Sequence, residues 1–274
     1  MHSDRVSQVL GAVLGSALML ASAPVAMADE DIYDTGYKGF AEAPPPPPSD
    51  RGIYFKGYVG QANTGTGSIW TPAYDTNDFT IFHNDIKSNA LFGVGIGWQA
   101  RHWLRFDLTG DYRGDTTFFA QDSYPAGVGF GAGTNEYTAD ISSWLFLANA
   151  YWDIGTWCGF TPYVGAGIGF ANISVNGLKD VNVPNNSVFY AADGTNTNFA
   201  WAIHAGVSYD ISPALSLDLA YRYADLGNAA TGVVTAYDNS SSYSQVAIRD
   251  ITANDVMLGV RYKFGRSEPA YMMK

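Results

Sequence analysis

Bulky apolar residues alternate with glycines or polar residues along several stretches of this chain, and this alternation limits the fold more than any other feature. Phe92, Val94, Ile96 and Trp98 share one parity, and the residues between them are all glycines. A period of two residues is typical of a β-strand, in which successive side chains point to opposite faces. Such a stretch therefore predicts a strand with one bulky apolar face and one small or polar face.

Eight stretches have this strand-like character, and their connections alternate between long and short. In 54–62 and 138–152 the sequence does not decide which face is the apolar one. An even number of antiparallel strands with alternating connections predicts an up-and-down barrel, with all short turns at one rim. The predicted strands are 54–62, 92–98, 103–112, 138–152, 162–170, 199–209, 215–223 and 251–264. The predicted long loops are 63–88, 114–137, 172–197 and 225–250, and the short turns are 99–102, 153–160 and 210–214.

Composition favours a membrane barrel over a water-soluble barrel. Charged residues make up only 15% of the chain and aromatic residues another 15%, so the Lys and Glu that coat soluble surfaces are scarce. Trp98, Trp103 and Tyr112 stand at strand ends, as aromatic girdles at membrane interfaces do. A soluble barrel of the lipocalin type is the alternative, and it would turn the bulky faces inward. We predict an all-β fold, an eight-stranded antiparallel up-and-down transmembrane β-barrel.

The ends of the chain predict export followed by a spacer. Residues 1–28 combine Arg5, an apolar run and Ala26-Met27-Ala28, which are the features of a cleaved signal peptide. No later stretch approaches the roughly 18 apolar residues of a spanning helix. Residues 29–51 contain five consecutive prolines and predict an extended periplasmic spacer, with a proline-recognition ligand as the alternative. The predicted barrel then covers 52–265, and a short periplasmic tail covers 266–274.

Charge and cysteine content exclude several classes of function. The formal net charge is −11 and the chain has no run of basic residues, so we expect no nucleic-acid partner. Cys158 is the only cysteine, which forbids an internal disulfide, and we expect it to be buried or interfacial beside Trp157. Residues 75–78 offer oxygen ligands but lack the glycine and distal Glu of a calcium loop. We predict neither a metal site nor a cofactor.

Ionisable residues on the inward parity are the candidate functional residues. Unpaired charges in a desolvated lumen are costly, so we expect them to neutralise one another across strands. One interpretation is a structural plug of salt bridges, and the other is a narrow charge-lined path for ions or small solutes. Eight strands leave an interior that side chains nearly fill, which disfavours a general porin. The predicted network comprises Arg105, Asp107, Asp111, Asp218, Arg222, Arg261 and Lys263, with Asp255 as a further candidate.

Two patterns that could indicate catalysis or nucleotide binding do not fit those functions. His204 and Ser208 share the inward parity, but they stand about 13 Å apart along one strand, too far to act as base and nucleophile. The glycine runs at 93–97 and 165–169 lack the spacing and the following helix of a phosphate-binding loop. We expect these glycines to make room for large neighbours, and we expect no enzyme activity.

Aromatic residues in the long loops are the candidates for contact with a partner. Function is expected in the loops because the rest of the barrel faces lipid or itself. Aromatic side chains among Asn, Ser, Thr and Gly suit adaptable contact surfaces, and they equally fit solvated loops around a small hydrophobic cluster. These residues are Tyr74, Phe79, Phe82, Phe118, Phe119, Tyr124, Phe130, Phe189, Tyr190, Tyr237 and Tyr243.

The signal peptide, the eight strands and the glycine pattern at 163–169 together resemble the small outer-membrane β-barrel family. That family includes the OmpA transmembrane domain, opacity-type proteins and surface antigens of alphaproteobacteria. The resemblance covers about residues 52–265 and implies that Tyr262 and Phe264 form the signal for the barrel-assembly machinery. The tail at 266–274 departs from the family, whose members usually end at that Phe.

The resemblance and the residue patterns lead to one functional expectation and one alternative. We expect a Gram-negative outer-membrane protein that supports the cell envelope and displays four loops as a surface antigen or adhesin. The alternative is a narrow, porin-like channel, and a hydrolase at the barrel rim is a distant third. The expected partners are outer-membrane lipid and lipopolysaccharide, the barrel-assembly machinery, and a host or surface ligand at the loops.

Overall fold

The computed structural model describes residues 51–72, 79–126, 131–184 and 186–264. The predicted signal peptide, spacer and C-terminal tail lie outside these residues, apart from Arg51 at the end of the spacer, as do the oxygen ligands at 75–78. Within the described part of the chain, no helix has the length and apolar character to cross a membrane.

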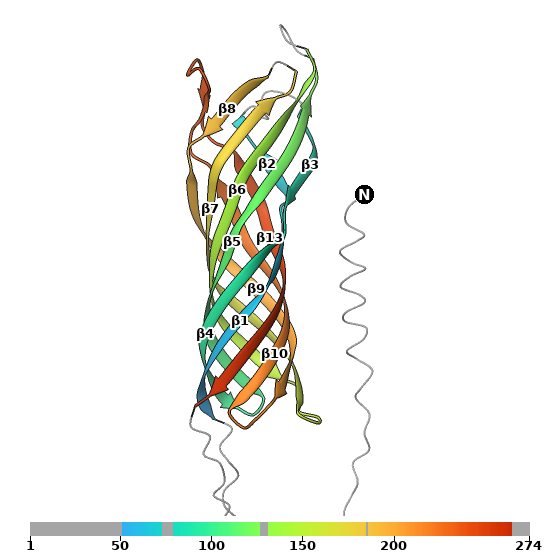
Figure 1. The fold of residues 1–274 in the computed structure, drawn as a ribbon, viewed down its shortest axis with the longest axis vertical. Helices are drawn as coiled ribbons and strands as arrows, with labels where there is room; N and C mark the ends of the chain where they lie inside the picture. The colour runs from blue at the N-terminus through green and yellow to red at the C-terminus, as the bar shows by residue number, and fades with distance from the viewer. Residues whose placement is uncertain (1–50, 73–78, 127–130, 185, 265–274) are drawn as a thin grey trace, which may run out of the picture. The chain divides into compact units, whose positions relative to one another are not determined.

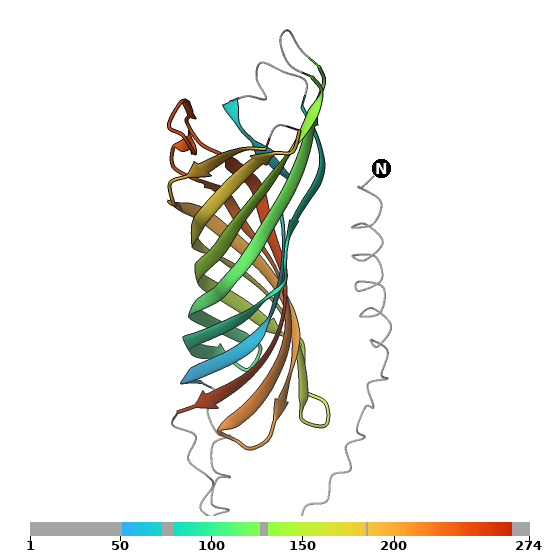
Figure 2. The same ribbon diagram turned by 45° about the horizontal axis from the view of Figure 1, so that its top comes forward.

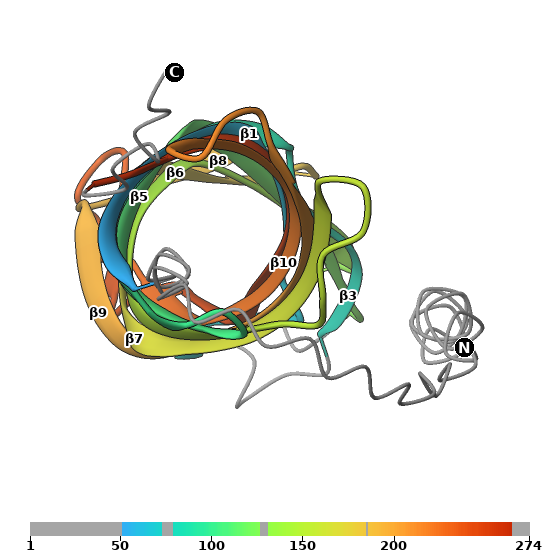
Figure 3. The ribbon, with the colours of Figure 1, turned by 90° about the horizontal axis from the view of Figure 1, so that it is seen from below.

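Eight long antiparallel strands form a closed ring, which confirms the predicted fold class (Figures 1 and 3). Each of them pairs with the next along the chain, and the last pairs back with the first, where Lys56 stands opposite Arg261. The strands are β1 (Gly52–Gly65), β4 (Asn89–Arg101), β5 (Leu104–Tyr124), β6 (Gly133–Asp153), β7 (Phe160–Asn182), β9 (Gly194–Asp210), β10 (Leu215–Ala230) and β13 (Ala247–Lys263).

Five shorter strands lie in the long connections, at the end of the barrel that Figure 2 turns forward. β2 pairs with β13 and β3 pairs with β5. At the end of β7, β8 pairs with β7, β11 pairs with β8, and β12 pairs with β11. Their bounds are β2 (Ser68–Trp70), β3 (Thr80–Ile86), β8 (Ser187–Ala191), β11 (Val234–Ala236) and β12 (Ser242–Tyr243). We call this end the long-connection end and the opposite one the short-turn end.

The prediction of four irregular long loops was wrong, because much of each segment is strand. β5 continues to Tyr124 and β6 begins at Gly133, so most of the second predicted loop is a hairpin. The small polar residues that suggested loops alternate with inward apolar residues such as Phe118 and Ala120, which are fully buried. The period of two residues persists there, but the polar face is now the outer one.

The apolar strand faces point outward around the short-turn half of the barrel. On β6 the outward residues run from Trp144 to Trp152, and these two side chains are 47% and 59% exposed. This span of nine residues matches the length of a tilted membrane-spanning strand, and the terminal Trp residues suit the two interfaces. We call this zone the belt. On β1, whose apolar face the sequence left undecided, Phe55 and Val59 point outward.

The strands continue beyond the belt into a second zone, which we call the extension. Its outer face is polar, as at Ser142 and Asp140 on β6, and its interior is a cluster of buried apolar side chains. Phe118, Ile173 and Leu226 are each no more than 1% exposed in this cluster. The extension therefore has the inside-apolar arrangement of a soluble protein, while the belt has the reverse.

The inward glycines of β4 provide room for tyrosines, as the sequence predicted. A Cβ atom added to Gly93 would overlap the ring of Tyr58, and one added to Gly97 would overlap the ring of Tyr54. Both tyrosines come from β1, which pairs with β4 in this register. The glycine pattern therefore serves the packing of the lumen.

Candidate functional site

The lumen inside the belt contains a network of ion pairs that joins strands far apart in the sequence. Near the short-turn rim, Arg105 on β5 pairs with Asp153 on β6 at 2.7 Å and also donates from Nε to the same carboxylate. Further along the lumen, Lys56 pairs with Asp107 at 2.7 Å. These contacts link three strands of the barrel wall through their inward side chains.

A chain of two arginines and two aspartates crosses the lumen next to the extension. Arg222 lies 2.7 Å from both Asp111 and Asp255, and Arg113 lies 2.6 Å from Asp255. Arg222 Nη2 makes these contacts as an ion pair without good hydrogen-bond alignment, whereas its Nε donates to Asp255 at 2.8 Å. All four residues are at most 2% exposed. Each buried charge thus has a buried counterion.

The charges in the lumen balance. A third group pairs Arg261 with Asp218 at 3.3 Å. Because a buried charge without a counterion is costly, this balance makes the set stable as a unit and fragile to the loss of any member. The paired cations are Lys56, Arg105, Arg113, Arg222 and Arg261, and the paired carboxylates are Asp107, Asp111, Asp153, Asp218 and Asp255.

Tyrosines fill the space between the ion pairs, and two of them donate hydrogen bonds to carboxylates of the network. The Tyr54 hydroxyl donates to Asp107 at 3.0 Å, and the Tyr58 hydroxyl donates to Asp111. The Tyr151 hydroxyl accepts from Lys56 at 3.1 Å, and the Arg105 guanidinium lies 4.7 Å from the centre of the Tyr163 ring. The lumen is therefore a polar packed interior.

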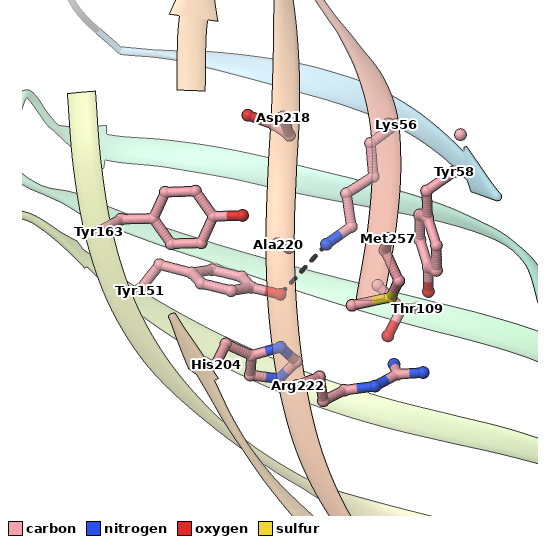
Figure 4. A pocket seen from close by; sticks show the side chains of 12 residues that line it. Lys56, Tyr58, Thr109, Tyr151, Tyr163, His204, Asp218, Ala220, Arg222 and Met257 are labelled. Carbon is pink, nitrogen blue, oxygen red and sulfur yellow. Dashed lines mark hydrogen bonds between the residues drawn. The ribbon is translucent and has the colours of Figure 1, made fainter. Parts of the chain in front are cut away.

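A small cavity remains among these side chains (Figure 4). Its volume is about 40 Å³, which corresponds to a few water molecules at most. In Figure 4 the Lys56 ammonium reaches toward Tyr151 across the cavity, with His204 and Arg222 beneath. Such a space can hold waters that bridge polar groups, but it is too small for a sugar or an amino acid.

The sequence identified six residues that form these ion pairs and missed three of their partners. Arg105, Asp107, Asp111, Asp218, Arg222 and Arg261 all lie in the network, and the further candidate Asp255 does too. Lys263 lies at the short-turn rim, where it lines a shallow polar pocket with Gln99 and His102. Lys56, Arg113 and Asp153 were missed, although Arg113 has the same parity as Asp111.

The two residues considered as a catalytic base and nucleophile, His204 and Ser208, each have other hydrogen-bond partners. His204 is hydrogen-bonded to Asn149 at 3.0 Å, while Ser208 donates to Asp218 and accepts from Arg261 at 2.9 Å. His204 and Ser208 therefore belong to different contacts. Cys158 was expected to be buried or interfacial beside Trp157, and the expectation of burial was wrong, because Cys158 is exposed in the β6–β7 turn. Its position at a membrane interface stays a prediction, and its backbone φ is 52°.

The aromatic residues of the predicted loops divide into structural and exposed groups. Phe118 is fully buried, and Phe189 packs against Tyr243 with ring centres 5.8 Å apart. His83, which lies in β3 rather than in a loop, contacts the ring of Phe119. The exposed aromatic residues of the extension are Phe82, Tyr190 and Tyr237. Tyr74 and Phe130 lie outside the described residues.

A second polar cluster is buried inside the extension. Asp122 accepts from the Tyr137 hydroxyl at 2.9 Å and from the Asn135 amide at 2.8 Å. Asp180 accepts from the Tyr243 hydroxyl at 2.8 Å. Burial raises the pKa of Asp180 to about 6, with a smaller contribution from the negative charge of Asp122. This cluster ties β7 to β12 at the long-connection end.

The last strand ends in the two residues predicted as an assembly signal. Tyr262 and Phe264 point outward, are 48% and 54% exposed, and their ring centres lie 5.1 Å apart. Both are therefore accessible on the lipid-facing side at the short-turn end. Their role in assembly remains a prediction.

Comparison with known proteins gives a consistent result. The model of the outer membrane protein beta-barrel domain matches residues 16–264. An uncharacterized protein of Brucella suis is 32% identical over 250 residues, which are 81% of this chain and 88% of that protein. Outer membrane protein PagN of Salmonella typhimurium is 25% identical over 222 residues, 78% of this chain and 90% of that protein.

A solved structure shares the fold. The outer membrane protein OprG from Pseudomonas aeruginosa aligns with a TM-score of 0.50 at 14% identity, covering 79% of this chain and 97% of that one. The closed ring of eight strands, the lipid-facing belt and these matches place the protein in the outer membrane. The chain belongs to the family of outer membrane proteins built on this β-barrel domain.

Proposed function

We propose that this protein supports the cell envelope as a closed barrel and displays its extension as a surface antigen or adhesin. The observation that carries the proposal is the filling of the interior along its length. Paired charges and tyrosines occupy the lumen, and an apolar cluster occupies the extension. Residues able to meet a partner are then those on the outside of the extension, where Tyr190 and Tyr237 are exposed.

The proposed orientation places the long-connection end outside the cell. Gly52 and Lys263, the first and last residues of the barrel strands, both lie at the short-turn end. Outer-membrane barrels keep their short turns in the periplasm and their long connections outside.

Cysteine labelling of intact cells tests the orientation with a control built into the chain. Cys158 is exposed at the short-turn end, and Ser244 is exposed between β12 and β13. A membrane-impermeant maleimide should leave Cys158 unlabelled in intact cells and label it after outer-membrane permeabilisation. The variant Ser244→Cys, in a Cys158→Ser background, should be labelled in intact cells. The reverse pattern would contradict the proposed display.

The channel alternative is favoured by one observation, the charged lining of the lumen. Against it, the charges neutralise one another in pairs, and the cavity among them holds about 40 Å³. Planar-bilayer recording of the purified protein separates the two functions. We expect no discrete openings. Regular openings whose conductance changes in Arg105→Gln or Asp218→Asn would show that the lumen conducts.

A further inference from the structure

A groove on the extension, between β8 and the β11–β12 hairpin, has the form of a ligand site. Its volume is about 440 Å³, within the range of sites that hold small organic ligands. One wall is β8 with the preceding turn at Asn186, and the other is the hairpin turn 236–241. The two walls are joined by backbone pairing, because Tyr190 stands opposite Thr235.

The hairpin turn that forms one wall is held by its own hydrogen bonds. The Ala236 amide donates to the Ser241 carbonyl at 2.9 Å, and the Tyr237 amide donates to the Val188 carbonyl on the opposite wall at 2.9 Å. The Ser240 amide donates to the Asp238 carboxylate at 3.0 Å. These bonds fix the groove before any ligand arrives, which lowers the entropic cost of binding.

Two tyrosines of the groove, Tyr190 and Tyr237, are exposed and do not take part in the packing of the extension. Tyr190 is 49% exposed and Tyr237 is 79% exposed. Within the described part of the chain, neither ring contacts another ring and neither hydroxyl has a hydrogen-bond partner. Their neighbours Phe189 and Tyr243 behave differently, since they pack together and Tyr243 donates to Asp180. An exposed tyrosine offers an apolar ring face and a polar tip to a partner.

The polar groups around these rings determine the class of ligand. Asn186, Asp238, Ser240 and Ser241 line the groove, and no Lys, Arg or His is among its described lining residues. Hydrogen bonds from Ser240 hold the pKa of Asp238 below its usual value, so this carboxylate stays an acceptor in mildly acidic media. Amide, hydroxyl and carboxylate groups beside an aromatic face match a molecule rich in hydroxyl groups, with apolar C–H faces.

The charge of the extension excludes polyanions as ligands. The four long connections, 63–88, 114–137, 172–197 and 225–250, contain eleven acidic residues and three basic residues, so a sulfated or phosphorylated chain would be repelled. The basic residues are Lys87, Lys179 and Arg249, and the acidic residues are Asp75, Asp78, Asp85, Asp115, Asp122, Glu136, Asp180, Asp193, Asp225, Asp238 and Asp250. We infer that the groove between β8 and the β11–β12 hairpin binds a neutral carbohydrate of one or two sugar units, with Tyr190 and Tyr237 against the sugar faces.

This inference rests on the proposed display function, and its test is separable from the labelling of Cys158 and Ser244→Cys. Purified full-length protein in nanodiscs is titrated with lactose, maltose and N-acetyllactosamine, and bound sugar is detected by saturation-transfer NMR. At least one of these sugars should bind, and Tyr237→Ala should weaken that binding by about tenfold or more. Tyr237→Phe keeps the ring and should retain most of the affinity.

Phe82→Ala is the matched control, because Phe82 is also an exposed aromatic residue of the extension but lies outside the groove. It should leave sugar binding unchanged. Heat-dependent gel mobility verifies that each variant is folded. Three results would overturn the inference: no binding of any of the three sugars, equal binding by Tyr237→Ala and the wild type, or preferential binding of heparin or of a cationic peptide. Correct labelling of intact cells together with any of these results would leave the display function intact and remove only the sugar site.

Discussion

The belt and the extension are built from the same strands but by opposite rules. Along β6 the outward residues are apolar from Trp144 to Trp152, and they become polar at Ser142 and Asp140. The inward residues change in the other direction, from Asn149 in the lumen to Leu147 and Leu145 of the apolar cluster, so the apolar interior already begins inside the belt. β6 stays paired with β5 and with β7 on both sides of this change, with register shifts between Arg113 and Thr116 and between Thr138 and Asp140. The side chains on each face therefore match the surroundings of their zone, lipid or water, while the backbone forms the same type of paired strand in both zones.

The difference shows what stabilises each zone. In the extension, water surrounds the outer face, so burial of apolar side chains provides the driving force. In the belt, lipid already satisfies the outer apolar face, and the interior depends on complete pairing of charges. Loss of one lumen charge should therefore do more damage than loss of one apolar side chain in the extension.

The largest effect is expected in the lumen. Arg222→Gln would leave Asp111 and Asp255 buried with reduced compensation, and we expect a loss of about 4 kcal/mol in the free energy of unfolding. Urea-induced unfolding in lipid vesicles measures it. Arg101→Gln, at an exposed site next to the β4–β5 turn, is the control and should change stability little. Equal effects of the two substitutions would show that the lumen charges are not a mutually dependent set.

A smaller and more local effect is expected in the extension. Phe118→Ala removes a fully buried ring from the apolar cluster, which should cost about 3 kcal/mol. Because the belt has its own stabilising contacts, hydrogen exchange should increase in the extension and stay slow in the belt. Increased exchange throughout β5 would instead mean that the two zones unfold together.

The smallest effect concerns pH and the extension alone. The pKa of Asp180 is raised to about 6, so this residue contributes stability below pH 4, and the contribution is lost as the pH rises through about 6. Asp180→Asn mimics the protonated form and should stabilise the extension at pH 7.5 by no more than about 2 kcal/mol. Hydrogen exchange of β7 and β12 at pH 4.5 and 7.5 measures this. Asp238→Asn, at an exposed site, is the comparison, and a pH response unchanged by Asp180→Asn would contradict the assignment.

Much of the belt could be predicted from the sequence, because the alternation of apolar and polar residues there indicates which side chains point outward and which point into the lumen. The alternation at 92–98 and 199–209 identified the lipid face, and the inward charges on β5, β10 and β13 followed from parity. The partners of those charges could not be predicted, because pairing depends on the register between strands. Lys56 is an example, since the faces of 54–62 look alike until β1 is placed between β4 and β13.

The extension is where sequence interpretation failed, for a physical reason. Its strands have small polar residues on the outer face, and the composition that results is also that of a loop. Phe118, Phe189 and Tyr237 were all candidates for contact with a partner. Phe118 is buried and Phe189 is partly buried, whereas Tyr237 is exposed. Nothing in the local sequence distinguishes these aromatic residues, because burial depends on which strands cover them.

By itself, the sequence determined the class of barrel, its alternation of long and short connections, and the residues that face lipid. These properties follow from local parity, which the pleat of a strand converts into direction. The tertiary structure alone decided the pairing of the lumen charges, the folding of the long connections into an extension and the position of the groove. Each of these depends on contacts between segments distant in the chain, and only closure of the barrel brings those segments together.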